Sequence, residues 1–160
     1  GKAGFSMVTG GGPGIMEAAN LGAYEAVGRS VGINIFLPHG ERRNSYVKES
    51  TGFYYFFNRK LILAYSAEAY VFFPGGYGTL DELFEILNLV ITKKIAGKIP
   101  IVLVGKSYWK PLHQWMHSLL KRKLETLNQK DLNIFTITDS VDEVVQKVRK
   151  CPVSIPRAGI

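Results

Sequence analysis

The sequence predicts an α/β protein: a Rossmann-like, three-layer α/β/α fold built on a parallel sheet. Three observations support this class. Short apolar runs alternate with helical patterns from one end of the chain to the other. Two of these runs end in a glycine-rich turn that leads directly into a helix. The composition, with 46% hydrophobic and 21% charged residues, is that of a globular domain and excludes collagen-like and disordered chains.

Each predicted strand is a run of apolar, β-branched or aromatic residues, and each predicted helix has an apolar face. The predicted strands are residues 5–9, 31–36, 69–73, 99–104 and 133–137. The predicted helices are residues 15–27, 55–66, 80–92, 109–122 and 141–149, and residues 40–52 are predicted to be a polar loop. Strands that alternate with helices run parallel, so any ligand should lie at the carboxyl ends of the strands.

The length of 160 residues fits one domain of about 150 residues. We therefore predict a single domain over residues 1–150 and a C-terminal tail over residues 151–160. The single cysteine, Cys151, excludes an intrachain disulfide framework and favours a reducing, cytoplasmic location. No apolar run is long enough for a membrane span, so no membrane association is expected. The net charge of +7 favours an anionic partner, either nucleic acid or a nucleotide.

The two glycine-rich turns are the candidate ligand site. Loop 1 is Thr9-Gly10-Gly11-Gly12-Pro13-Gly14, and loop 2 is Pro74-Gly75-Gly76-Tyr77-Gly78-Thr79. Glycines let backbone N–H groups approach a ligand closely, and a helix N-terminus behind them favours a phosphate. Each loop alone is equally consistent with a plain tight turn. Two such loops at equivalent ends of parallel strands favour a small phosphorylated ligand, and we expect both to converge on one anion site.

Three carboxylates, Asp81, Glu82 and Glu85, follow loop 2 and are predicted to lie at the start of its helix. The simplest interpretation is that they stabilise the helix dipole, while Thr79 caps the helix or contacts a phosphate oxygen. A carboxylate next to a phosphate site repels the anion, however, which suggests a catalytic role, as in glycoside cleavage. Arg59 stands among apolar residues, where spacing alone favours a snorkelling or paired side chain over a functional one.

Longer stretches around these residues resemble the LONELY GUY (LOG) family, also known as "possible lysine decarboxylase". The stretches are residues 9–20, Phe57-Asn58-Arg59-Lys60, and residues 74–83. Residues 34–41, with Asn44, Tyr46 and residues 92–95, resemble the longer bacterial subgroup of the family. The resemblance covers about residues 5–123, and the paired glycine motifs are highly specific.

The resemblance implies a nucleoside 5′-monophosphate phosphoribohydrolase, which hydrolyses the N-glycosidic bond of AMP, or of N6-modified AMP in cytokinin biosynthesis. Glu82 matches the family's catalytic carboxylate and Arg59 its catalytic arginine. The implied substrate-binding residues are Gly11, Gly12, Gly14, Met16, Lys60, Gly75, Gly76, Gly78 and Thr79. The resemblance also implies a homodimer or higher homo-oligomer, for which the aromatic residues 53–57 would supply contact surface.

No cofactor and no metal are expected. Lysine decarboxylation ordinarily needs pyridoxal phosphate on a lysine, and no lysine lies beside either loop in a suitable way. His113 and His117 are spaced like a zinc motif but lack its glutamate and a third ligand. Family members begin with a further strand and helix before the strand at Phe5. Because an interior strand is hard to delete, we expect this chain to be a piece of a longer product.

Two other functions remain as alternatives. One is a non-catalytic nucleotide-binding or sensing protein, which would not need Glu82. The other is a single-stranded nucleic-acid binder, suggested by the net charge and by 12% aromatic residues. Such binders interleave aromatic and basic residues, whereas residues 53–57 are uninterrupted by charge. We therefore rank the hydrolase first, the nucleotide sensor second and the nucleic-acid binder third.

Overall fold

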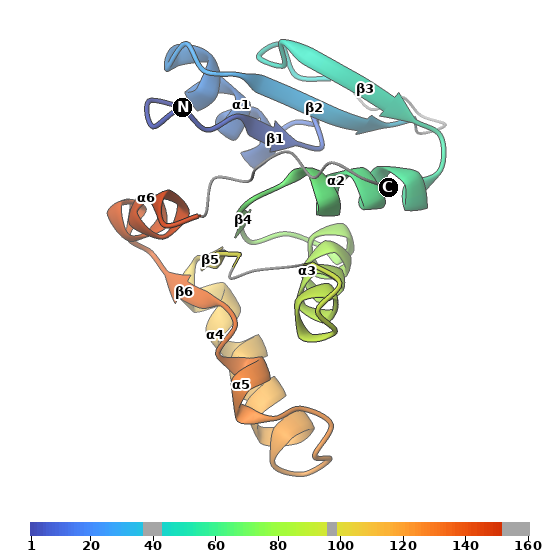
Figure 1. Cartoon of the computed structure of the whole chain (residues 1–160), viewed down its shortest axis with the longest axis vertical. Coiled ribbons are helices and arrows are strands. Elements are labelled where there is room, and N and C mark those ends of the chain that lie inside the picture. Colours follow the sequence, from blue (N-terminus) through green and yellow to red (C-terminus); the bar gives the residue numbers. More distant parts are fainter. Residues whose placement is uncertain (37–42, 96–98, 152–160) are drawn as a thin grey trace. The chain divides into compact units, whose positions relative to one another are not determined.

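The computed structural model describes residues 1–36, 43–95 and 99–151. The predicted tail beyond Cys151 and the subgroup-like stretch at residues 37–41 lie outside these ranges. The chain divides into two compact units, Gly1–Ala67 and Glu68–Ile160, and each is described by itself (Figure 1).

The first unit contains a parallel sheet with the strand order β1-β2-β3. Its elements are β1 (Met7–Thr9), α1 (Ile15–Glu25), β2 (Ser30–Ile35), β3 (Glu49–Phe53) and α2 (Phe56–Ser66). In the register of the sheet, Val8 pairs with Val31 and Ile33 pairs with Thr51. The carboxyl ends of all three strands therefore lie at one edge of this sheet, and loop 1 begins at that edge.

Strand β3 was predicted as part of the polar loop over residues 40–52, and that prediction is wrong. Its sequence, Glu49-Ser50-Thr51-Gly52-Phe53, carries no apolar alternation because most of the strand is exposed. Backbone pairing with β2 defines it instead. Arg29 also donates two hydrogen bonds to Glu49, of 2.8 and 2.6 Å, which lower the pKa of that carboxyl group.

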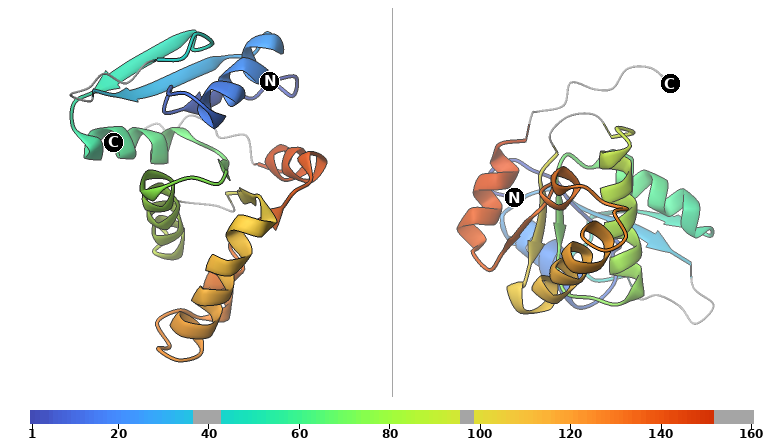
Figure 2. Two further views of the ribbon diagram at one scale, coloured as in Figure 1. Left: turned by 180° about the vertical axis from the view of Figure 1, so that it is seen from behind. Right: turned by 90° about the horizontal axis from the view of Figure 1, so that it is seen from below.

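The second unit contains a parallel sheet with the strand order β4-β5-β6. Its first elements are β4 (Tyr70–Phe72), α3 (Tyr77–Ile91), β5 (Ile101–Val104) and α4 (Lys106–Trp115). A π-helix (Met116–Lys121), α5 (Gln129–Leu132), β6 (Thr136–Thr138) and α6 (Val141–Arg149) follow. Figure 2 shows this course from two further directions, with α3 following directly on β4. Trp109 is fully buried, and its indole N–H donates to the carbonyl of Val104 at 3.0 Å.

The predicted α/β class with parallel strands and interleaved helices is confirmed, and the structure is consistent with the predicted three-layer Rossmann-like fold. Several boundaries differ from the prediction. Helix α4 begins at Lys106 rather than residue 109, because Gly105 with a φ of 108° precedes it and Asp139 accepts from the Lys106 N–H. The predicted strand over residues 133–137 corresponds to β6, which starts later, at Thr136. Helix α5 was not predicted, because a single turn is too short to show a helical period of apolar residues.

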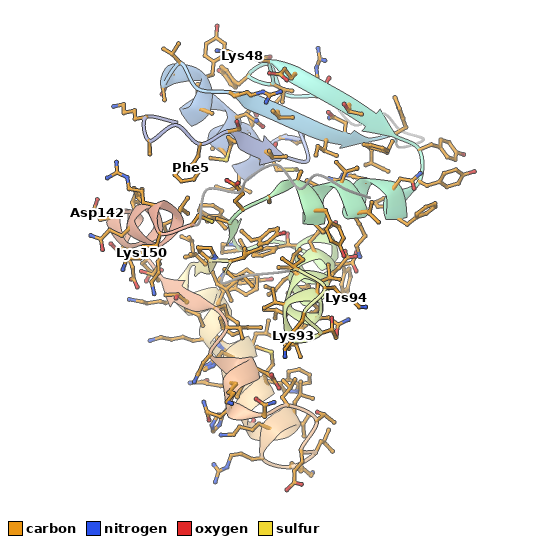
Figure 3. The ribbon with its side chains drawn as sticks, viewed as in Figure 1. Phe5, Lys48, Lys93, Lys94, Asp142 and Lys150 are labelled. Atoms are coloured by element: carbon orange, nitrogen blue, oxygen red, sulfur yellow. The ribbon has the colours of Figure 1, made fainter. Side chains whose placement is uncertain are left out.

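Charged residues complement the ends of two helices, α3 and α6 (Figure 3). Lys93 and Lys94 follow α3, and Lys150 follows α6, where cations favour the negative end of the helix dipole. Asp142 lies in the first turn of α6, where an anion is favourable. Within the described ranges, no helix is long and apolar enough to cross a membrane.

The side chain of Cys151 is buried, and its thiol donates to the carbonyl of Glu68. Burial raises the pKa of the thiol, and the charge of Glu68 raises it further. Since the thiolate is the reactive form, this environment keeps Cys151 unreactive at neutral pH.

Candidate functional site

Loop 1 contains a tightly packed stretch, in which neighbouring side chains leave no room for a Cβ atom at Gly10 or Gly11. Gly10, Gly11 and Gly12 are buried. A Cβ atom added to Gly10 would meet the guanidinium group of Arg59, and it would lie 2.9 Å from the sulfur of Met16. A Cβ atom added to Gly11, whose φ is 78°, would lie 2.5 Å from Nδ2 of Asn34. The structure therefore brings the predicted site residues Met16 and Arg59 together at loop 1.

Arg59 is anchored at the edge of the sheet where loop 1 begins. It lies in the first turn of α2 and is half-buried. Its Nε–H donates a 2.9 Å hydrogen bond to the carbonyl of Ile33, near the carboxyl end of β2. This bond uses one of the five N–H donors of the guanidinium group. Lys60, the next residue of α2, is also half-buried.

A buried polar network lies beneath loop 1. The side-chain amide of Asn44 donates to the carbonyls of Gly11 and Gly12 at 3.1 and 3.0 Å, and to Oδ1 of Asn20 at 3.0 Å. The Gly11 N–H donates to Oγ1 of Thr9 at 2.9 Å, and the Thr9 hydroxyl donates to Oδ1 of Asn20 at 2.7 Å. Loop 1 is thus fixed through both its carbonyl oxygens and an N–H group.

This network changes what Gly11 can contribute to ligand binding. Its N–H group is directed to Thr9 inside the protein, so the N–H is already engaged. The Gly11 carbonyl accepts from both the side chain and the backbone N–H of Asn44. In a trans peptide the next N–H points opposite to the carbonyl, so the N–H of Gly12 points away from Asn44. Gly14 has a φ of 72° and begins α1 as its N-cap residue.

Loop 2 is more open than the buried part of loop 1. Gly75, Gly76 and Gly78 are exposed, and a Cβ atom added to Gly76 or Gly78 would meet nothing within 4 Å. Only Gly75 has a close neighbour, the side chain of Thr79, which lies where its Cβ would be. The hydroxyl of Tyr108 donates a 2.6 Å hydrogen bond to the Gly75 carbonyl. The N–H of Gly76 therefore points away from Tyr108.

Helix α3 begins at Tyr77, three residues before the predicted start at Leu80. The sequence did not indicate this start because Gly78 is the second residue of the helix, and glycine is a poor helix former. Gly76 is the N-cap residue, with no side-chain cap, so the predicted capping role of Thr79 is wrong. The N–H groups of the first turn, including those of Gly78 and Thr79, have no partner within the helix.

The carboxylates after loop 2 do not lie in the first turn of α3, as the sequence had suggested. Asp81 and Glu82 are in the second turn and Glu85 is in the third. Because the dipole effect falls off within the first turn, stabilisation of the dipole does not explain them. Glu82 is half-buried and lies four residues after Gly78, on the same helix face and about 6 Å further along the axis.

A family model described as "possible lysine decarboxylase" matches residues 16–148. The chain belongs to this family. This is the LOG family that the glycine motifs indicated, so the predicted resemblance is confirmed. No match to the chain was found among curated proteins.

The LOG assignment covers α1, α2 and α3, and so includes Arg59, Lys60 and Glu82. Sequence reasoning gave no role to three polar residues that the structure places against the loops, Asn20, Asn34 and Tyr108. Asn20 is the clearest of them, because a fully buried asparagine in a helix needs partners. Oδ1 of Asn34 is buried and accepts no hydrogen bond from a described residue. Convergence of the two loops on one anion site stays a prediction.

His113, which was discounted as a zinc ligand, also has defined surroundings. The ring of His113 packs edge-on against Phe135, with 5.6 Å between ring centroids. In the described part of the chain, no group of three or more potential metal ligands is present. In the first unit, the cation of Lys48, which is labelled in Figure 3, lies 5.0 Å from the centroid of the Tyr24 ring.

Proposed function

We propose that this LOG-family protein is a nucleoside 5′-monophosphate phosphoribohydrolase acting on AMP or N6-modified AMP. Water adds to C1′ of the ribose, the N-glycosidic bond breaks, and the base leaves with the bonding electrons and gains a proton. The products are the free base and ribose 5-phosphate. Membership of the family supports the reaction class.

The observation that carries the proposal is the start of α3. An exposed glycine turn precedes a helix whose first turn contains no carboxylate, and open space surrounds Gly76 and Gly78. This combination suits a phosphate monoester, which would accept hydrogen bonds from the first-turn N–H groups. Helix α1 is less suitable, because Glu17 lies in its first turn. The 5′-phosphate is therefore assigned to loop 2, with Thr79 offering a hydroxyl group.

Glu82 and Arg59 are the proposed catalytic residues. A phosphate at the start of α3 would leave Glu82 one helical turn further on, on the same face. Cleavage develops positive charge on the ribose, which the carboxylate of Glu82 stabilises while it orients the water. The departing base develops negative charge, which the guanidinium of Arg59 offsets. Met16, which contacts loop 1 beside Arg59, and Lys60 are proposed to contact the substrate.

The description of the family names lysine decarboxylation, a reaction that needs pyridoxal phosphate on a lysine amine. The residues of this chain do not fit that cofactor. Loop 1 and loop 2 contain no lysine, and the first turn of α3, where a phosphate fits best, is also without one. No step is assigned to pyridoxal phosphate.

We also propose that the protein acts as a homodimer or higher homo-oligomer in the cytoplasm. The side chains of Tyr54, Tyr55, Phe56 and Phe57 are all more than half exposed, which supplies apolar surface for self-association. Size-exclusion chromatography with light scattering tests this assembly.

The test of the reaction is to incubate the full-length protein with AMP and with adenosine and to separate the products by chromatography. We expect adenine and ribose 5-phosphate from AMP and far slower release from adenosine, because binding of the phosphate is used to reach the transition state. Equal turnover of both substrates would contradict the role of loop 2. Binding of AMP without release of base would favour the nucleotide sensor.

A further inference from the structure

The geometry points to Asn44 and Thr9 as positioning residues that fix loop 1 and thereby seat the guanidinium group of Arg59. This inference rests on the proposed function, in which Arg59 acts on the departing base. Neither residue has a role among the proposed substrate-binding or catalytic residues.

The first step of the argument is that Gly10 is fixed from both sides. On one side, the Thr9 hydroxyl accepts from the N–H of Gly11 and donates to Asn20. On the other side, Asn44 donates to the carbonyls of Gly11 and Gly12 through its side chain, and to Gly11 again through its backbone N–H at 2.8 Å. The backbone of Gly10 has little freedom between these anchors.

The second step is that the anchors are themselves rigid. Asn20 is fully buried within α1, and its Nδ2 donates to Oγ of Ser30, also fully buried, at 2.8 Å. Oδ1 of Asn44 accepts from the backbone N–H of Tyr46 at 3.1 Å. The network therefore connects β1, α1, the start of β2 and the segment after β2. A buried and satisfied network of this kind specifies one conformation.

The third step is that Gly10 borders the space that the guanidinium group of Arg59 occupies. The guanidinium group lies where a Cβ of Gly10 would be, and its Nε–H bonds to the carbonyl of Ile33. Movement of Gly10 would therefore change the space that the guanidinium occupies. Catalytic groups misplaced by about 1 Å can cost about 100-fold in rate. In contrast, the proposed phosphate site at α3 is formed by residues outside this network.

The test compares four variants of the full-length protein. Thr9→Val is nearly isosteric and removes only the hydroxyl, and Thr9→Ser restores it. Asn44→Ala removes the other anchor. Asn128→Ala is the matched control for fold stability, since it removes the capping box of α5 and touches neither loop.

We expect Thr9→Val and Asn44→Ala to lower kcat for AMP by about 10- to 100-fold while KM changes by less than about threefold. Thr9→Ser should retain nearly full kcat, and Asn128→Ala should lower Tm without changing kcat. A rise in KM at unchanged kcat, or equal kcat in all four variants, would overturn the inference.

A second readout does not depend on activity. The Nε–H of Arg59 should give a protected NMR signal, because it is bonded to the Ile33 carbonyl. We expect this signal, and the amide of Gly11, to exchange at least about tenfold faster in Thr9→Val and Asn44→Ala, but not in Asn128→Ala. Unchanged exchange would refute the inference even if AMP is hydrolysed. If the signals exchange faster in the two variants but the wild-type protein does not hydrolyse AMP, the proposed function is refuted instead.

Discussion

Loop 1 and loop 2 share a strand–glycine–helix design but use their glycines for opposite purposes. In loop 1, Gly10, Gly11 and Gly12 are buried, and Gly10 and Gly11 make room for the side chains of Arg59, Met16 and Asn34. In loop 2, Gly76 and Gly78 are exposed and border open space. Gly10 and Gly11 therefore serve the protein's own packing, whereas Gly76 and Gly78 leave space that a ligand can occupy.

The two loops are nevertheless fixed by a common device. In each, a side chain located 33 residues further along the chain donates to a glycine carbonyl: Asn44 to Gly11 and Tyr108 to Gly75. Each bond turns the following N–H away from the donor. The difference lies in the number of bonds, since loop 1 has a buried network and the described contacts of loop 2 depend on Tyr108 and the packing of Thr79.

The largest effect expected around loop 1 follows substitution of Arg59, which lies in α2 and packs against Gly10. Arg59→Lys keeps the charge but loses the planar group that bonds Ile33 and packs on Gly10, so we expect kcat for AMP to fall by about 100-fold or more. Steady-state kinetics with AMP measure this. Arg29→Lys is the matched control, because Arg29 is an exposed partner of Glu49 before the start of β2. A similar loss in both variants would show that Arg59 has no special role.

The next effect distinguishes the two loops by stability. Gly11→Ala should destabilise the fold by about 1–2 kcal/mol from its positive φ, and by about 1–3 kcal/mol from overlap with Asn34. At Gly76, φ is −91° and an added Cβ atom would meet nothing within 4 Å. Gly76→Ala should therefore leave the free energy of unfolding unchanged or raise it by about 0.4–1 kcal/mol, while KM for AMP rises. Urea unfolding and kinetics measure both. Equal destabilisation by the two substitutions would remove the contrast between the loops.

The smallest expected effect concerns Tyr108. Tyr108→Phe removes the hydrogen bond to the Gly75 carbonyl, which contributes about 0.5–1.5 kcal/mol. Because this bond shapes loop 2, we expect its loss to raise KM for AMP a few-fold. Tyr24→Phe, an equivalent change on an exposed ring in the first unit, should leave KM unchanged. If Tyr108→Phe has no effect on KM, then the Tyr108 bond does not shape loop 2 for the ligand.

The parts of the fold that the sequence predicted best are those with strong periodicity. The apolar run at residues 99–104 and the helix at residues 141–149 correspond to β5 and α6. Strand β3 was missed because its residues are exposed and polar, and only pairing with β2 defines it. The start of α3 was misplaced because Gly78 lies inside its first turn.

The sequence alone identifies the two glycine loops and proposes the catalytic candidates, but it does not identify the supporting residues. Glycine-rich turns and the family motif are short, contiguous stretches that can be recognised from the sequence alone. Asn20, Asn44 and Tyr108 act on the loops across 11 to 33 residues. Only the folded chain brings such residues together, and a single sequence carries no sign of those contacts. Convergence of the loops and the assignment of Glu82 stay predictions.

The most direct test of the central claim compares Glu82→Gln with Asp81→Asn. Both substitutions remove one carboxylate from the second turn of α3, but Asp81 is exposed and Glu82 is half-buried on the face of Gly78 and Thr79. Hydrolysis of AMP by Glu82→Gln should fall by about 10²–10³-fold, while Asp81→Asn stays within about twofold of the wild type at equal Tm. Retention of more than about a third of turnover by Glu82→Gln would contradict the catalytic role of this carboxylate.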